Sequence, residues 1–189
     1  CTAMIYRSLR PIHAWCNRWT VPGYLALGAA TGLSLAFAIL GAFGEPAAGP
    51  VGVAAILALA AAWLVKRAYW TLIDTVPAAS TPESATGLGR IGKVRLLDPP
   101  QTGETFVTKE MGFRIARRHA GRLRAIAVIA GLVVPAALVV VALVAPQPAR
   151  SLAAGLAALL ALAGALVERW LFFAEAKHTT MLYYGAASA

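Results

Sequence analysis

Four long apolar runs constrain the fold of this chain more than any other feature of its sequence. Charged residues occur in these runs only toward the ends of the second and the fourth. A helix needs about 20 apolar residues to cross the hydrocarbon core of a bilayer, and it satisfies its own backbone hydrogen bonds there. We therefore predict an all-α fold, a polytopic transmembrane helical bundle that forms one integral membrane domain over residues 1–189. The four predicted spans cover residues 21–43, 51–73, 125–145 and 152–173.

The composition favours a membrane protein over a soluble globular domain. Hydrophobic residues make up 59% of the chain and charged residues 13%, whereas soluble domains carry about 25% charged residues. A chain of this kind cannot cover a globule with polar surface. Its apolar excess consists of Ala, Leu and Val rather than aromatic residues, which favours helices with small side chains over the strands of a β-barrel.

The connections and the basic residues together predict the topology. Two short Pro-rich segments, 44–50 and 145–151, join the spans into two helical hairpins, and a long basic loop, 74–124, separates the hairpins. Of the 17 Lys and Arg residues, only Arg150 lies on the side of the short turns. Cytoplasmic segments carry the excess of Lys and Arg, so we predict that both ends of the sequence and the long loop face the cytoplasm. The net charge of +9 then reflects topology, and we expect no nucleic-acid partner.

The beginning of the sequence is unlike that of a complete chain. Residue 1 is Cys, the first methionine is Met4, and the residues before the first span lack the pattern of a secretory signal peptide. We therefore expect that the sequence begins within a longer protein.

The stretch Gly87-x-Gly89-x-x-Gly92 has the glycine spacing of a dinucleotide-binding turn. That turn works only between a strand and a helix, where the pyrophosphate lies on the helix N-terminus. Here a Pro- and Ser-rich segment precedes the glycines, and Pro99-Pro100 follows them. We therefore predict that no dinucleotide binds, and that the glycines let the loop fold tightly against a partner surface.

Four charged residues lie within the predicted spans, at similar distances from the cytoplasmic ends: Lys66, Arg67, Glu168 and Arg169. Ionisable residues inside a membrane are costly and are candidates for function. Lys and Arg reach water with their long side chains, whereas Glu168 needs a partner, so we predict an ion pair between Glu168 and either Lys66 or Arg67. Two interpretations stay open: a pair that locks helix packing, and a proton-accepting group near a quinol headgroup.

The densest basic run of the sequence lies at residues 116–124, directly before the third span. Basic residues at such a place attract anionic lipid with about 1 kcal/mol per residue, and they also suit docking to an acidic partner subunit. We expect one or both roles for five arginines, one of which precedes the run: Arg114, Arg117, Arg118, Arg122 and Arg124.

The sequence shows no chemistry of its own. His13, His119 and His178 lie outside the spans, whereas a bis-histidyl haem needs ligands on facing helices. The chain has no cysteine run, nucleophile–base pair or carboxylate pair, so we predict no catalytic residue, no metal site and no cofactor bound by it. The aromatic residues near the cytoplasmic ends of the second and fourth spans are predicted to form an interfacial belt: Tyr69, Trp70, Trp170, Phe172 and Phe173.

Four segments carry a resemblance to a known family. They are AMIYRSLRPIHAW (3–15), KRAYWTLIDT (66–75), SATGLGRIGKVRLLDPPQTGETFVTKEMGFRIARRHAGRLR (84–124) and ERWLFFAEAKHTTMLYYG (168–185). Together they resemble the membrane anchor subunit of DMSO reductase, the DmsC type, and the third segment is the most specific. The resemblance extends over essentially the whole sequence.

The resemblance implies the C-terminal half of an eight-helix anchor in a bacterial inner membrane. Such an anchor is haem-free, oxidises menaquinol in anaerobic electron transport and passes electrons to a ferredoxin-like iron–sulfur subunit, which acts with a molybdopterin catalytic subunit. The quinol-site residues of that family lie on earlier helices, so no position of this sequence inherits them. We accordingly expect a non-catalytic anchor and quinol-oxidising subunit of an oxidoreductase complex.

Two other functions fit parts of the sequence. A small-molecule transporter uses broken helices around a mid-membrane site; Pro135 in the third span fits this, but the intramembrane charges lie near one interface. A packing or assembly protein needs only close helix contacts, for which four glycines are candidates: Gly28, Gly32, Gly155 and Gly164.

Overall fold

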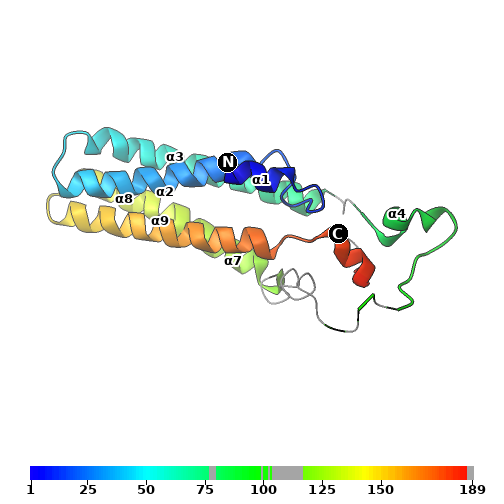
Figure 1. The fold of residues 1–189 in the computed structure, drawn as a ribbon. Coiled ribbons are helices and arrows are strands. Elements are labelled where there is room, and N and C mark those ends of the chain that lie inside the picture. The colour runs from blue at the N-terminus through cyan, green and yellow to red at the C-terminus, as the bar shows by residue number, and fades with distance from the viewer. Residues whose placement is uncertain (77–79, 99, 102, 104–116, 187–189) are drawn as a thin grey trace.

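The computed structural model describes residues 1–76, 80–98, 100–101, 103 and 117–186. The long helices lie side by side as a bundle (Figure 1), and no strand occurs among the residues described. Four helical stretches are long and apolar enough to cross a membrane, which confirms the predicted all-α fold with four spans. They are α2 (Thr20–Ala42), α3 (Ala48–Thr75), α7 (Ala120–Val128) continued by the π-helical turn η2 (Ile129–Val133) and by α8 (Val134–Val144), and α9 (Ala149–Ala174).

Short turns join the spans into the two predicted hairpins. In the turn between α2 and α3, Gly44 has a φ of 69°, a left-handed conformation that glycine adopts without steric cost. In the turn between α8 and α9, Nε2 of Gln147 donates a 2.8 Å hydrogen bond to the carbonyl of Gly41 at the end of α2. This bond ties the two hairpins together at the end of the bundle that carries the short turns.

The interior of the bundle consists largely of small residues. Many residues buried between the helices are alanines, while leucines and valines of the same helices are exposed on the outside. Because lipid tails are as apolar as leucine, helices in a membrane associate through close packing rather than through the hydrophobic effect. Small side chains allow that close packing. Typical buried examples are Ala30, Ala55, Ala62, Ala157 and Ala161.

The third and fourth spans come very close together at Gly131 in η2 and Gly164 in α9. A Cβ atom added to Gly131 would lie 2.6 Å from the Cα of Gly164, so a side chain fits on neither residue. The helix is widened here, since the N–H of Val134 donates to the carbonyl of Ile129. Pro135 follows directly and cannot donate to the carbonyl four residues before it. The proline therefore accompanies a local π-helical turn and does not break the span.

The structure corrects part of the prediction about packing glycines. Gly164 makes the expected close contact, but a Cβ built on Gly28, Gly32 or Gly155 meets nothing within 4 Å. Gly28 and Gly32 lie on an exposed face of α2. Gly131 was not among the predicted packing glycines, because glycine content does not show which face of a helix meets a neighbour.

The polar parts of the chain gather at one end of the bundle (Figure 1). The described part of the long loop and the C-terminal segment both lie there, opposite the short turns. The N-terminal helix α1 (Thr2–Ser8) packs against α2. This arrangement agrees with the topology expected from the basic residues, and the cytoplasmic location of this end stays a prediction. The short elements of the polar end are α4 (Pro82–Thr86), the 3₁₀ turn η1 (Leu88–Arg90) and the 3₁₀ helix η3 (Thr179–Tyr184).

Candidate functional site

A buried ion pair joins α3 to α9 near the polar end of the bundle. The ammonium group of Lys66 contacts Oε1 of Glu168, and the two residues are only 2% and 3% exposed. The structure thus confirms the ion pair predicted for Glu168 and selects Lys66 as its partner. Arg67 is exposed instead, and its guanidinium carbon lies 5.9 Å from the centre of the Trp63 ring.

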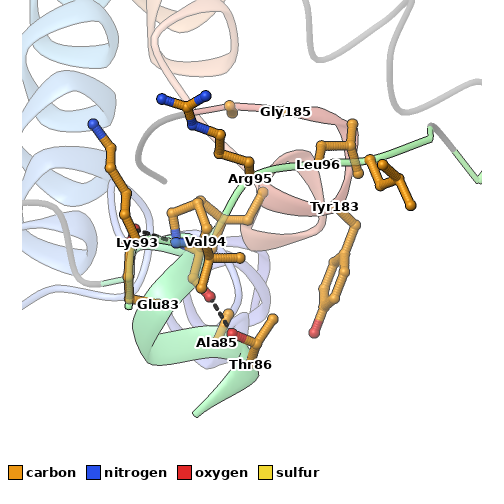
Figure 2. A pocket seen from close by; sticks show the side chains of 13 residues that line it. Glu83, Ala85, Thr86, Lys93, Val94, Arg95, Leu96, Tyr183 and Gly185 are labelled. Carbon is orange, nitrogen blue, oxygen red and sulfur yellow. Dashed lines mark hydrogen bonds between the residues drawn. The ribbon is translucent and has the colours of Figure 1, made fainter. Parts of the chain in front are cut away.

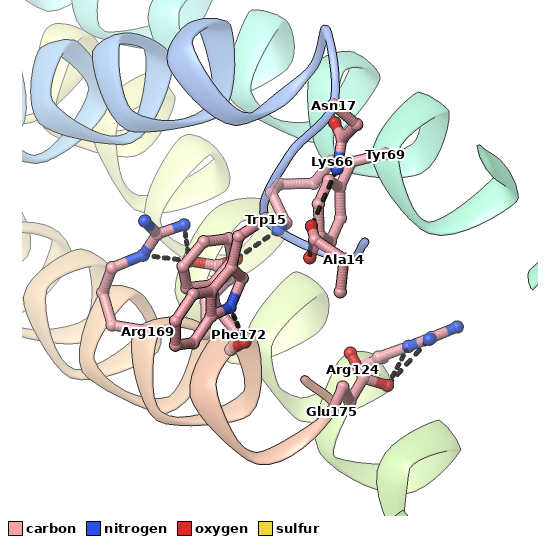
Figure 3. A network of polar contacts seen from close by, with 10 residues as sticks. Ala14, Trp15, Asn17, Lys66, Tyr69, Arg124, Arg169, Phe172 and Glu175 are labelled. Atoms are coloured by element: carbon pink, nitrogen blue, oxygen red, sulfur yellow. Dashed lines mark hydrogen bonds and ion pairs between the residues drawn. The ribbon is translucent and has the colours of Figure 1, made fainter. Parts of the chain in front are cut away.

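Arg169 and two tyrosine rings surround this pair, and Figure 3 shows Arg169 and one of the rings, that of Tyr69. Nε of Arg169 donates a 2.6 Å hydrogen bond to Oε2 of Glu168, so one carboxylate serves two cations. The guanidinium carbon of Arg169 lies 4.1 Å from the centre of the Tyr24 ring, and Nζ of Lys66 lies 3.9 Å from the centre of the Tyr69 ring. Cation–π contacts are strongest where the cation is desolvated. Two cations share one carboxylate, so one positive charge is not neutralised by it, and the two rings stabilise this excess charge.

The space beside the pair is too small for a quinone or quinol. The cavity that Glu168 lines together with Leu27, Leu132 and Gly164 has a volume of about 10 Å³. That is close to the 10–15 Å³ or so that one water molecule needs, whereas ligand pockets measure about 300 Å³ or more. A quinol ring does not reach Glu168 in this arrangement, which favours the interpretation of the pair as a packing lock.

The segment before α2 covers the aromatic side chains of the polar end. Nε1 of Trp15 donates a 2.9 Å hydrogen bond to the carbonyl of Phe172, and the hydroxyl of Tyr69 donates a 3.0 Å bond to the carbonyl of Ala14 (Figure 3). Tyr69 and Phe172 are buried, so the predicted interfacial belt is wrong for these two residues. Trp170 is exposed. A segment distant in the sequence folds over the ends of α3 and α9 and turns an expected surface into an interior.

Arg117, one of the predicted docking arginines, binds the end of α9. Its Nε donates a 3.0 Å hydrogen bond to the carbonyl of Ala174, and its Nη2 donates a 2.9 Å bond to the carbonyl of Ala176. The last carbonyls of a helix have no partner within the helix. Arg117 therefore caps α9 and holds the loop against it.

Arg124 connects three helix ends. Its guanidinium binds both carboxylate oxygens of Asp74 at the end of α3, and its Nε donates a 2.9 Å hydrogen bond to Glu175 just after α9. Hydrogen bonds between arginine and carboxylates are strong because both groups are charged. No sequence pattern singled out Asp74 or Glu175, whose partner lies about 50 residues away in the chain.

The five predicted docking arginines thus fall into different classes. Arg117 and Arg124 bind within the chain, whereas Arg118 and Arg122 are exposed. Arg114 lies outside the described residues. A role in lipid or partner binding stays a prediction for the exposed pair.

Glu175 is expected to make the stability of the bundle depend on pH. Burial raises the pKa of Glu175 above its ordinary value of 4.5, and this effect outweighs the opposing effect of Arg124. Between the two pKa values the folded state binds more protons than the unfolded state, so stability falls as the pH rises. From pH 4.5 upward, the Tm of the wild type in detergent should therefore fall more steeply than that of Glu175→Gln. The exposed Glu45→Gln variant should follow the wild type, and equal slopes in all three proteins would contradict the prediction.

The glycine stretch of the loop forms a turn that differs from a dinucleotide site. Thr81 caps α4 through reciprocal hydrogen bonds with Ser84, and Gly87 ends this helix with a φ of 71°, as glycine commonly does. A Cβ added to Gly89 would lie 2.9 Å from the Cβ of Glu83. No strand precedes the glycines in the described part of the loop. The glycines therefore serve a compact loop.

The same loop and the C-terminal segment form an open groove of about 610 Å³ (Figure 2). Residues 93–97 line it opposite η3, and the N–H of Val94 donates a 3.3 Å hydrogen bond to Glu83. Leu97, which lines the groove, and Ile91, which precedes the lining residues by two positions and is 85% exposed, present apolar surface on this loop. Exposed apolar surface of this kind marks sites of interaction when it is contiguous.

One curated protein resembles this chain over nearly the whole sequence. The chain is 32% identical over 184 residues to a subunit of the sulfite dehydrogenase of Allochromatium vinosum. The match covers 97% of this chain but 55% of the relative, so the chain spans about half of the length of that protein. No protein-family model and no solved structure matches the chain. The chain is therefore a multi-pass membrane protein similar to a subunit of an oxidoreductase, and the finer resemblance to the DMSO reductase anchor is not confirmed.

Proposed function

We propose that this chain is part of the membrane subunit of an oxidoreductase complex, where it anchors extramembrane subunits that exchange electrons with quinone. The 32% identity to a sulfite dehydrogenase subunit over 97% of the chain carries the proposal. The name of the relative, as one subunit of a dehydrogenase, implies further subunits. A bundle with short turns at one end, and with the described part of a basic loop at the other, is suited to hold such subunits on one side of a membrane.

The relative suggests sulfite as the electron donor. A sulfite dehydrogenase converts sulfite and water to sulfate, releasing two electrons and two protons, and a quinone that accepts them becomes quinol. The resemblance to the DMSO reductase anchor implies the opposite flow, from menaquinol to the acceptor. Both directions would use an iron–sulfur subunit and a molybdopterin subunit as partners. We propose sulfite-to-quinone transfer, since measured sequence identity supports it.

The four helices of this chain act in anchoring and docking rather than in quinone chemistry. The cavity beside Glu168 admits one water molecule at most. The resemblance assigns the quinone-binding residues to helices that precede this sequence. We therefore propose that Lys66, Glu168 and Arg169 hold the bundle together, and that the polar end receives the partner.

The docking surface is proposed to lie on the loop around residues 88–97. Leu88, Ile91 and Leu97 are exposed there, and the same stretch carries Arg90, Lys93 and Arg95. An apolar centre with charged surroundings is typical of an interface between subunits. The positive charges suit a partner with an acidic surface.

The double substitution Ile91→Ser/Leu97→Ser is expected to release the partner subunits. Truncating a central anchor costs about 2 kcal/mol or more, so the loss of both should weaken binding of the partner by up to about a thousandfold. Membranes with the full-length protein should reduce quinone when sulfite is added, and membranes with the double variant should not, although the helices still insert. The measurement is sulfite-dependent quinone reduction together with co-purification of the partners.

Phe43→Ser provides the matched control, because Phe43 is 80% exposed at the opposite end of the bundle. It should leave co-purification and activity unchanged. A full-length protein that purifies without any redox subunit would contradict the proposed function. Retention of the partner by the double variant would contradict only the proposed docking surface. Quinol oxidation with DMSO, and none with sulfite, would assign the opposite direction of electron flow.

A further inference from the structure

A groove between the start of α2 and the end of α3 has no role in the proposed function. Its volume is about 430 Å³, and it opens at the polar end of the bundle. Arg18 and Trp19 contribute to it from the α2 side, and Arg67, Thr71 and Thr75 follow one another along α3. Its apolar wall consists of Leu64, Ala68 and Leu72.

The groove has the charge of an anion site. Arg18 and Arg67 form no ion pair within the described part of the chain, and no carboxylate lines the groove. Their guanidinium carbons lie 5.5 Å and 5.9 Å from the centres of the Trp19 and Trp63 rings, which leaves the donor N–H groups of both arginines available. Guanidinium groups bind phosphate through paired hydrogen bonds.

The start of α2 adds to the positive potential. The N–H groups of Thr20 and Gly23 donate to the carbonyls of Asn17 and Trp19, and Pro22 has no N–H, so the start of α2 contributes its dipole rather than free donors. The hydroxyls of Thr71 and Thr75 donate to the carbonyls of Arg67 and Thr71, so they have no proton to offer a ligand. The hydrogen bonds to an anion therefore come from the two arginines.

The position of the groove along α3, within the membrane-spanning part of the helix, favours a lipid over a soluble anion as its ligand. Arg67 precedes the end of α3 by eight residues, which is about 12 Å along the axis, and its guanidinium lies near the Trp63 ring, one turn further from that end. Leu64 lies about one turn deeper and is exposed on the same wall. A phosphate near the arginines and an alkyl chain against Leu64 would occupy both parts of the groove at once.

We infer that this groove binds an anionic phospholipid, with its phosphate between Arg18 and Arg67 and one acyl chain along Leu64. A zwitterionic lipid fits less well, because the two arginines repel its ammonium group. The site is independent of the substrate of the complex, so the test of the lipid site does not depend on whether the proposed function is correct.

Native mass spectrometry of the complete protein, delipidated in mild detergent, tests the inference with phosphatidylglycerol and phosphatidylcholine as probes. The wild type should retain phosphatidylglycerol at least about tenfold better than phosphatidylcholine, and Arg18→Gln/Arg67→Gln should lose this preference. Arg122→Gln removes one exposed arginine from α7 and should keep the preference. Arg67→Lys keeps the charge but loses the paired hydrogen bonds, so it should retain the lipid more weakly than the wild type.

Three results would overturn the inference. The first is retention of phosphatidylglycerol equal to that of the wild type by the double variant or, where the double variant does not fold, by Arg67→Lys. The second is equal binding of the two lipids by the wild type. The third is arginine-dependent binding of inorganic phosphate alone without retention of lipid, which would assign the groove to a soluble anion. Because Arg67→Lys keeps a cation at its place, it remains informative if the double variant fails to fold.

Discussion

The substitution Gly131→Val is expected to abolish accumulation of the folded protein in the membrane. A Cβ on Gly131 meets the Cα of Gly164 at 2.6 Å and its carbonyl carbon at 3.2 Å. Both are backbone atoms, so no change of rotamer relieves the clash and α9 must move away. Overpacking of an interior costs about 1–3 kcal/mol and more where the backbone must shift. Moving α9 also separates the small side chains whose close packing holds helices together in lipid.

Gly155→Val is the matched control, since it introduces the same side chain on α9 where nothing lies within 4 Å of the added Cβ. It should accumulate and melt like the wild type. The measurement is the amount of full-length protein in the membrane fraction, followed by thermal unfolding in mild detergent. Wild-type accumulation and Tm for Gly131→Val would show that the two spans do not approach each other as closely as described.

Glu168→Gln is expected to destabilise the bundle by about 3–5 kcal/mol, the typical effect of removing one partner from a buried ion pair. The substitution leaves Lys66 at 2% exposure without a carboxylate. Glutamine also has one acceptor oxygen in place of two, so Lys66 and Arg169, which each use one carboxylate oxygen, can no longer both be paired. The effect should appear as a lower Tm and as a smaller amount of assembled protein.

Removing both charges of the pair should recover much of this loss. In Lys66→Met/Glu168→Gln the buried ammonium is absent, and replacing a buried pair by groups of similar volume is often nearly neutral. The exposed Glu45→Gln variant controls for the change of carboxylate to amide and should stay within about 0.5 kcal/mol of the wild type. A Tm of Glu168→Gln equal to that of Glu45→Gln would contradict the packing lock.

The same variant separates the two interpretations of Glu168. A packing residue changes the amount of assembled complex but leaves the turnover of each assembled complex unchanged. A proton-accepting residue near quinol lowers turnover in complexes that assemble and melt normally. Measuring quinone turnover per assembled complex in Glu168→Gln therefore decides between them.

The two predictions concern one stretch of α9. Gly164 and Glu168 are four residues apart, which places them on the same side of a helix. Both line the small cavity that Leu27 and Leu132 also border. Substitutions at the glycine contact and at the ion pair share neighbours, so their effects on stability are not expected to add.

The local sequence was sufficient to predict the spans, because backbone groups in lipid must find their hydrogen-bond partners within the chain. An apolar run of sufficient length must form a helix there to satisfy its backbone, whatever its neighbours are. The ion pair at Glu168 could also be predicted, since a carboxylate at that depth requires a cation and few are present. The choice of Lys66 over Arg67 could not, because adjacent residues on a helix point about 100° apart and only the packing shows which one faces α9.

Contacts between distant segments could not be predicted in the same way. The carbonyls bound by Arg117 lie 57 and 59 residues further along the chain, and no sequence pattern links them. Tyr69 and Phe172 are aromatic residues near the ends of two spans, as in an interfacial belt, yet the segment around Trp15 buries them. Without knowledge of that segment's position, an aromatic residue near a membrane surface has no reason to be assigned to an interior.

The amino-acid sequence by itself determined that lipid surrounds this protein, how many spans it has and which end of the bundle carries the loop. Hydropathy and charge are properties of each residue, so they do not depend on tertiary contacts. Only the tertiary structure decided which of the small and charged residues meet. Gly131 and Gly164 are in contact, whereas Gly28 meets no neighbour. Arg124 binds Asp74 and Glu175, whereas Arg122 is exposed. Helix rotation and chain crossing set these outcomes, and both arise from the packing of all four spans together.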